Sequence, residues 1–230
     1  MTDARCLVCA AVLAALIAPI SGADADITYS YDHGTTGAAV GPPSSFPQDP
    51  VTGWGNYFIT QPAGEIITSI SVAFGPSFAP GRPVTVWLFS DADSDFNPLN
   101  AVPLTSTTMV PTTLGGSVFN TFPITPTQVS GGFFALAVAY TQKGVDKPAA
   151  EDLSGPVDRS WLFYNPAATG LNVTNLGANA LAKRGDQVLP LPGVWMIRAN
   201  GTEIPAPGAA ALAIAAGLGF VRRSPRSPLQ

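Results

Sequence analysis

Apolar and polar side chains alternate with a period of two along much of residues 27–202, and this alternation predicts β-strands. The clearest example is residues 66–74, where Ser69 and Ser71 share the face opposite the apolar side chains. Those apolar side chains are Ile66, Ile70, Val72 and Phe74. A strand with one apolar face and one hydroxyl-bearing face is typical of a sheet that covers a core on one side.

Other segments predict strands that differ in burial. Residues 83–89 place Val84, Val86 and Leu88 on one face, whereas Gly132–Tyr140 is apolar on both faces, as a central strand would be. Shorter candidate strands are residues 57–60, 105–110, 118–124, 160–164 and 194–199. About eight strands separated by turn signals predict an all-β fold, namely a β-sandwich with the jelly roll as one candidate arrangement.

Composition agrees with an all-β domain. Glycine and proline number 23 each among 230 residues, which disfavours long helices, and the apolar content of 46% is sufficient for a core. From Asp24 to Glu203 the chain carries 14 acidic and 7 basic residues, a balance of −7. Because no basic stripe is present, we expect no nucleic-acid partner.

Residues 1–25 have the features of a secretory signal peptide. Arg5 supplies a positive start, and an apolar stretch of 12 residues, Cys6–Ile17, follows it. Small residues then allow signal peptidase to cleave after Ala23 or after Ala25. The alternatives are a buried helix or a membrane anchor, but 12 residues are too short to span about 30 Å of hydrocarbon. We expect an exported protein whose N-terminal signal helix is removed.

Both cysteines, Cys6 and Cys9, fall inside this signal segment. The mature protein would therefore contain no thiol. Disulfides, zinc–thiolate sites and cysteine nucleophiles are accordingly excluded from the domain at residues 26–203.

The C-terminal segment, residues 204–230, predicts insertion into a membrane. A Pro- and Gly-containing stretch, Ile204–Gly208, precedes 13 uncharged residues, Ala209–Val221, and an arginine cluster follows. A short hydrophobic helix with cationic residues behind it is typical of a stop-transfer segment whose arginines stay on the cytoplasmic side. The alternative is a terminal helix packed on the domain. The arginines are Arg222, Arg223 and Arg226.

The order of motif, hydrophobic helix and arginine cluster over residues 204–226 resembles the PEP-CTERM sorting signal of bacteria. The motif here is Pro205-Ala206-Pro207, so Ala206 stands where the family has glutamate. The resemblance implies recognition by exosortase, a membrane-embedded cysteine protease, and transfer to the cell surface and its polysaccharide matrix. It implies a membrane insertion that is transient, whereas an uncut chain would be simply anchored.

An acidic segment after residues 83–89 is the strongest candidate for a metal site. Carboxylates at alternate positions can converge on a hard cation such as Ca²⁺, and the segment resembles the start of an EF-hand-like loop. It departs from that loop at Phe96, where glycine is expected, and at Val102, where a closing glutamate is expected. The alternative is a solvated turn. The candidate ligands are Asp91, Asp93, Asp95 and Asn97.

The sequence offers little for catalysis, and we expect no enzyme. His33 is the single histidine, and the serine turn at residues 75–79 lacks the second glycine of a nucleophile elbow. Glu151 and Asp152 are adjacent acids, but no spacing marks them as a glycosidase pair. A hydrolase would require a cleft that joins His33 to a carboxylate and a serine.

Carbohydrate binding is the alternative function. Sugars stack on exposed aromatic rings, and Trp54, between two glycines, is the tryptophan that the pattern places in a loop. The other three lie in expected strands and are predicted to be core residues; they are Trp87, Trp161 and Trp195. The first hypothesis is therefore an exported, non-enzymatic surface or matrix protein, and the second is a secreted sugar-binding module that uses calcium or no cofactor.

Overall fold

A computed structural model describes residues 26–187 and 193–204. The expected signal peptide and the expected tag, apart from Ile204, lie outside these residues. The described chain is all-β, with thirteen strands and four short 3-10 turns. None of its helices is long and apolar enough to cross a membrane.

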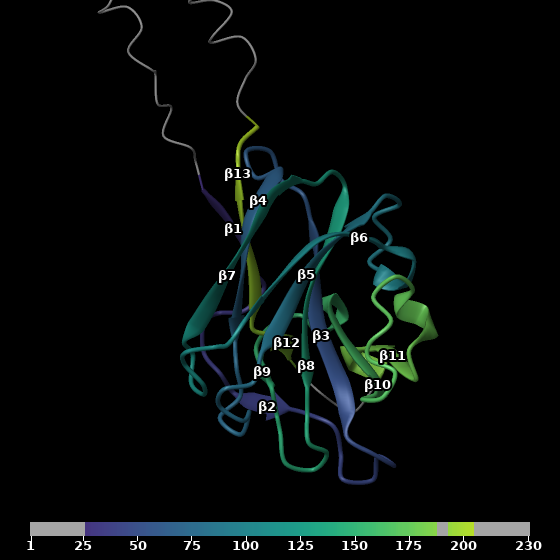
Figure 1. Ribbon diagram of the computed structural model, residues 1–230. Helices are drawn as coiled ribbons and strands as arrows, with labels where there is room; N and C mark the ends of the chain where they lie inside the picture. The colour runs from purple at the N-terminus through teal and green to yellow at the C-terminus, as the bar shows by residue number, and fades with distance from the viewer. Residues whose placement is uncertain (1–25, 188–192, 205–230) are drawn as a thin grey trace, which may run out of the picture. The chain divides into compact units, whose positions relative to one another are not determined.

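The strands form three antiparallel sheets (Figure 1). The four-stranded sheet has the order β1 (Ile27–Tyr29), β13 (Ile197–Thr202), β4 (Ile66–Ala73), β7 (Phe119–Gln128). The six-stranded sheet has the order β11 (Leu181–Arg184), β10 (Ser160–Pro166), β3 (Pro50–Ile59), β8 (Gly132–Tyr140), β5 (Val84–Asp91), β6 (Val102–Met109). The small third sheet has the order β12 (Val194–Trp195), β9 (Ala149–Asp152), β2 (Ala38–Val40). The 3-10 turns are η1 (Pro98–Asn100), η2 (Val157–Arg159), η3 (Leu176–Ala178) and η4 (Gly185–Gln187).

The two larger sheets enclose the main core. Ile70 of β4 and Phe122 of β7 belong to the same buried cluster as Val86 of β5 and Phe133 of β8. Since these residues come from both sheets, the sheets pack face to face, as predicted for a sandwich. Burial of these aromatic and β-branched side chains is the main favourable term in folding.

A second cluster covers part of the outer face of the six-stranded sheet. Phe134 of β8 and Phe163 of β10 point to this face, and Leu176 of η3 packs over them. Leu171, from the segment between β10 and η3, joins the same cluster. The outer face is therefore partly covered by the chain's own loops.

The predicted strands are confirmed, with boundary shifts that have physical causes. β8 covers the residues expected, Gly132–Tyr140, whereas residues 194–199 divide into β12 and β13. In β4 a register shift between Ile67 and Ser69 reverses the alternation, so Ile67 is fully buried and Ile66 only partly. The expectation that Ile66 shares the core face of Ile70 was therefore wrong.

The expected loop position of Trp54 was also wrong. Trp54 lies within β3, its side chain is fully buried, and its ring packs edge-on against Phe74 at 6.0 Å. The flanking glycines are needed for packing, since a Cβ on Gly53 would lie 2.8 Å from Leu171 and one on Gly55 2.5 Å from the Phe134 ring. Glycine therefore flanks Trp54 because neighbouring side chains pack directly against the backbone of this strand. A buried indole cannot stack on a sugar, so Trp54 is a core residue.

Candidate functional site

The predicted acidic segment forms a tight loop after β5. Asp91, the last residue of β5, is buried, whereas Asp93 and Asp95 are exposed. One carboxylate oxygen from each residue lies within 4.8 Å of the other two. The structure therefore brings together three of the four predicted ligands, and three hard oxygen donors at this separation could hold a divalent cation.

The electrostatics of this loop centre on Asp91. Burial raises the pKa of Asp91, and the neighbouring Asp93 and Asp95 raise it further, although a hydrogen bond from Tyr57 opposes them. The Tyr57 hydroxyl donates to Asp91 Oδ2 at 2.5 Å, and burial together with this contact raises the pKa of the phenol. Carboxylates held this close repel one another when all are ionised, so a proton or a cation between them would relieve the repulsion.

Asn97 contacts the acidic loop through its backbone N–H, which donates to Asp95 Oδ1 at 2.7 Å. The Asn97 Oδ1 accepts from the Leu99 backbone N–H at 3.3 Å, which caps η1, so Asn97 as a fourth ligand stays a prediction. Asn100 also contacts the acidic loop, as a hydrogen-bond donor, since its Nδ2 donates to Asp93 Oδ2 at 2.9 Å. The sequence does not reveal Asn100 as a contact of this loop, because only the η1 turn returns it to the loop.

Phe96 adopts the backbone conformation that the expected glycine would have supplied. Its φ is +64°, in the left-handed region, which costs a non-glycine residue about 1–2 kcal/mol. The ring offsets this cost by packing, with the Arg159 guanidinium 3.7 Å from its centroid and the Tyr57 ring 5.2 Å away. The departure from the calcium-loop pattern is therefore accommodated by side-chain contacts.

His33, Asp152 and Ser154 meet at the end of β9. The Ser154 hydroxyl donates to Asp152 Oδ1 at 2.5 Å and lies 3.0 Å from His33 Nδ1, and the His33 backbone N–H donates to Asp152 Oδ2 at 2.6 Å. Burial acts to raise the pKa of Asp152, but the hydrogen bonds from Ser154 and His33 outweigh it and lower that pKa. The ionised Asp152 therefore connects the segment at His33 to the turn at Ser154 through hydrogen bonds.

This arrangement differs from a serine–histidine–carboxylate relay. In a relay the serine hydroxyl gives its proton to the imidazole and the carboxylate binds the other ring nitrogen. Here the serine donates to the carboxylate, so Ser154 has a weak base as its partner. The adjacent acids Glu151 and Asp152 are consecutive residues of one strand and point to opposite faces, which does not suit paired glycosidase chemistry.

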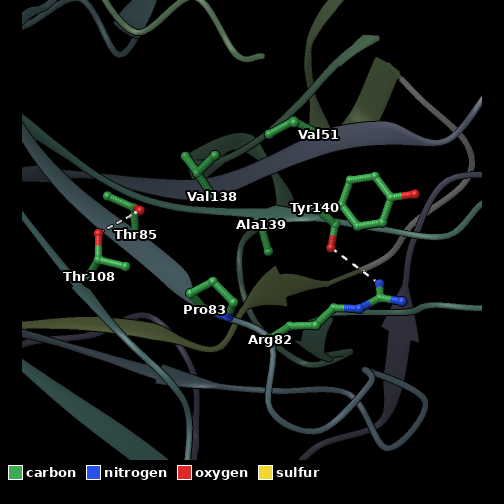
Figure 2. Close-up of a pocket in the computed structure, with 8 residues that line it drawn as sticks. All are labelled: Val51, Arg82, Pro83, Thr85, Thr108, Val138, Ala139 and Tyr140. Atoms are coloured by element: carbon green, nitrogen blue, oxygen red, sulfur yellow. Dashed lines mark hydrogen bonds between the residues drawn. The ribbon is translucent and has the colours of Figure 1, made fainter. Parts of the chain in front are cut away.

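A groove of about 360 Å³ lies on the six-stranded sheet, and Figure 2 shows the residues that line it. Its side chains come from β3, β5, β6 and β8 and from the turn before β5. No local motif in the sequence joins four strands, so the sequence alone does not reveal this groove. The lining residues are Val51, Arg82, Pro83, Thr85, Thr108, Val138, Ala139 and Tyr140.

The sorting-motif residues Pro205, Ala206, Pro207, Arg222 and Arg223 lie outside the described residues. The PEP-CTERM resemblance therefore stays a prediction.

Comparisons with known proteins indicate the fold alone. No protein-family model matches the chain, and no curated protein matches it significantly. Among solved structures the chain is similar to the clostridial cysteine protease Cwp84 after propeptide cleavage, at 11% identity and a TM-score of 0.50. The match covers 78% of this chain and 40% of that one. Residues 26–204 contain no cysteine, so what the two share is the arrangement of strands.

Proposed function

We propose that this protein is exported and resides at the cell surface or in the extracellular matrix, where its β-sandwich acts as a non-enzymatic interaction domain. Signal peptidase would remove residues 1–25, and an exosortase-type protease would process the tag at residues 204–230. The proposal rests on the order of these two sequence segments around a domain without cysteine.

The pairing of β1 with β13 is the structural observation that supports this proposal most directly. Ile27 pairs with Gly201, so the first and last described strands are neighbours in one sheet. A domain whose two ends meet can carry an export segment and a sorting segment without interruption of its sheets. The sandwich would thus be a single cargo between two membrane-directed segments.

We further propose that the sandwich is a jelly roll. Eight strands, taken in chain order as β1, β3, β4, β5, β6, β7, β8 and β13, divide between the two larger sheets. In the four-stranded sheet the order is first, eighth, third and sixth, namely β1, β13, β4 and β7. In the six-stranded sheet the order of the remaining four is second, seventh, fourth and fifth, namely β3, β8, β5 and β6. This is the order of a jelly roll, an architecture used by lectin domains and capsid proteins.

The polar clusters of the described residues favour a role without catalysis. Asp152 uses its carboxylate to hold His33 and Ser154, and the acidic loop has a tyrosine and an asparagine as its hydrogen-bond donors. These contacts stabilise loops, and the Ser154 hydroxyl donates to a carboxylate although His33 Nδ1 lies 3.0 Å away.

Mass spectrometry of the protein from fractions of its native host tests the proposal. We expect a chain that starts at Asp24 or Asp26 and ends near Pro207, recovered from the surface or the medium. An Ala23→Arg, Ala25→Arg double variant should retain the signal segment, because large charged residues block signal peptidase. A membrane-bound chain that ends at Gln230 would contradict tag processing. A soluble cytoplasmic chain that retains Met1 would overturn export as well.

A further inference from the structure

We propose that the groove on the six-stranded sheet binds a neutral polysaccharide. This inference rests on the proposed role as a surface interaction domain and assigns its ligand class and binding face. The groove occupies the part of the outer face that the described loops leave open, beside the region covered by Leu171 and Leu176. It is a shallow surface that crosses four strands, a shape that suits an extended chain.

An aromatic ring is fixed at the edge of this groove. Tyr140 is 45% exposed, and its hydroxyl donates to Asp49 Oδ2 at 2.9 Å, which sets the direction of the ring. The Arg82 guanidinium lies 5.2 Å from the ring centroid, and its Nη1 donates to the Tyr140 carbonyl oxygen at 3.4 Å (Figure 2). A pre-oriented aromatic ring gives the apolar C–H face of a sugar a stacking surface at low entropic cost.

Hydroxyl groups suited to a sugar lie on the floor of the groove. Thr85 and Thr108 are directly paired on β5 and β6, and their Oγ1 atoms are 2.8 Å apart. Either hydroxyl can donate to the other, so the second keeps its proton for a ligand and both keep lone pairs. Val138, which pairs with Thr85 from β8, supplies the adjacent apolar surface.

The charges at the groove are compensated within the protein. Arg82 forms an ion pair with Asp146, whose side chain is 1% exposed, and Asp49 accepts hydrogen bonds from Tyr140 and from the Lys143 backbone N–H. Arg82 is the one cationic side chain among the described residues that line the groove, and it is already paired, so an anionic polymer would meet no free cation among them. The domain as a whole is acidic. A ligand rich in hydroxyls and without charge matches a surface with one ring, paired hydroxyls and no unpaired cation.

The sheet extends this surface in one direction. Trp87 lies two residues beyond Thr85 on β5, so it shares the outer face. Its side chain is partly exposed, so its prediction as a core residue was wrong. Trp87 pairs with Leu136 of β8, the next outward position after Val138. Tyr140 and Trp87 therefore mark two ends of one face, which favours a polymer over a single sugar.

Binding of the full-length protein to a polysaccharide panel tests this inference. The panel contains neutral β-glucan, mannan, xylan and galactan, with alginate and hyaluronan as anionic members. We expect binding to at least one neutral member, unchanged in 1 M salt. Tyr140→Ala and Thr108→Val should each weaken it, Tyr140→Ala by about tenfold or more. Melting temperatures near the wild-type value would show that both variants fold.

Phe119→Ala is the matched control, because Phe119 also carries an arginine over its ring, Arg198 at 4.1 Å, but lies on the four-stranded sheet. It should bind as the wild type does. No binding to any neutral member, salt-sensitive binding to anionic members alone, or equal binding by Tyr140→Ala would each overturn the inference. Export is tested separately in the host, so either proposal can fail without the other.

Discussion

Asn56 of β3 donates two hydrogen bonds from its buried amide, to the Trp195 carbonyl oxygen at 2.7 Å and to the Ile197 carbonyl oxygen at 3.2 Å. Its Oδ1 accepts from the Ser160 hydroxyl, whose oxygen in turn accepts from the Trp195 backbone N–H. This network joins the six-stranded sheet to the chain between β12 and β13, where the other two sheets meet.

Replacement of Asn56 by leucine should destabilise the protein by about 3 kcal/mol, because two buried carbonyl oxygens and a hydroxyl lose their partner. Chemical denaturation followed by tryptophan fluorescence measures the loss. Asn175→Leu, at an exposed asparagine, is the control and should change the free energy of unfolding by less than about 0.5 kcal/mol. Equal effects of the two variants would contradict this role for Asn56.

Calcium is predicted to raise the melting temperature by several degrees if the acidic loop binds it, since a ligand at 100 times its dissociation constant contributes about 2.7 kcal/mol. Asp93→Asn should abolish the shift, because it removes one of the three converging carboxylates. Asp158→Asn, at a half-exposed acid of η2, should keep it. The measurement is thermal denaturation with Ca²⁺ or with a chelator. Identical curves for the wild type would rule out this site.

Asp152 should make the protein sensitive to acid. Its pKa in the folded state lies below the ordinary value of 3.8. The contribution of its carboxylate to the free energy of unfolding is therefore present above that pH and is lost as the pH falls through the lowered value. Asp152→Asn should therefore cost about 2 kcal/mol near pH 5 and less near pH 2. Urea denaturation across this range measures the difference, with Asp158→Asn as the control. A loss that does not vary with pH would contradict the charged role.

Glu151 should have the opposite pH dependence. Its side chain is 1% exposed, and neither carboxylate oxygen makes a hydrogen bond within standard limits to the described residues. Burial raises its pKa above the ordinary 4.5, with partial opposition from the Gly193 amide. Stability from this group is therefore greatest below pH 4.5 and falls as the pH rises through the raised value.

Glu151→Gln removes this titration and should stabilise the protein by about 1 kcal/mol at pH 7, with little effect near pH 4. The free energy of unfolding at the two pH values gives the comparison. Glu203→Gln, at an exposed glutamate, should be neutral at both. Destabilisation by Glu151→Gln at pH 7 would show that the ionised carboxylate has a stabilising partner.

Local pattern predicted the strands that have regular alternation and failed where register or tertiary contacts intervene. The β4 bulge between Ile67 and Ser69 changes which isoleucine is buried, and the identities of these two residues do not predict the bulge. The four strands that were missed have three or four residues each, too short for a period to appear; they are β1, β2, β9 and β11.

The acidic loop and the groove differ in how far the sequence could reveal them. Asp91, Asp93 and Asp95 are close in the chain, so spacing alone predicted their convergence. Tyr140, Thr85 and Thr108 become neighbours only through the pairing of β8 with β5 and of β5 with β6. The joining of His33 to Asp152 and Ser154 likewise depends on contacts across more than one hundred residues.

The sequence by itself determined the all-β class, because a period of two and a high content of glycine and proline are local properties. It also determined the acidic loop and the absence of cysteine between residues 26 and 204. Only the tertiary structure decided that Trp54 is core, that Ser154 faces a carboxylate, and that an open groove crosses four strands. Each of these depends on which strands pair and in what register, and pairing between distant segments is set by the packing of the whole core.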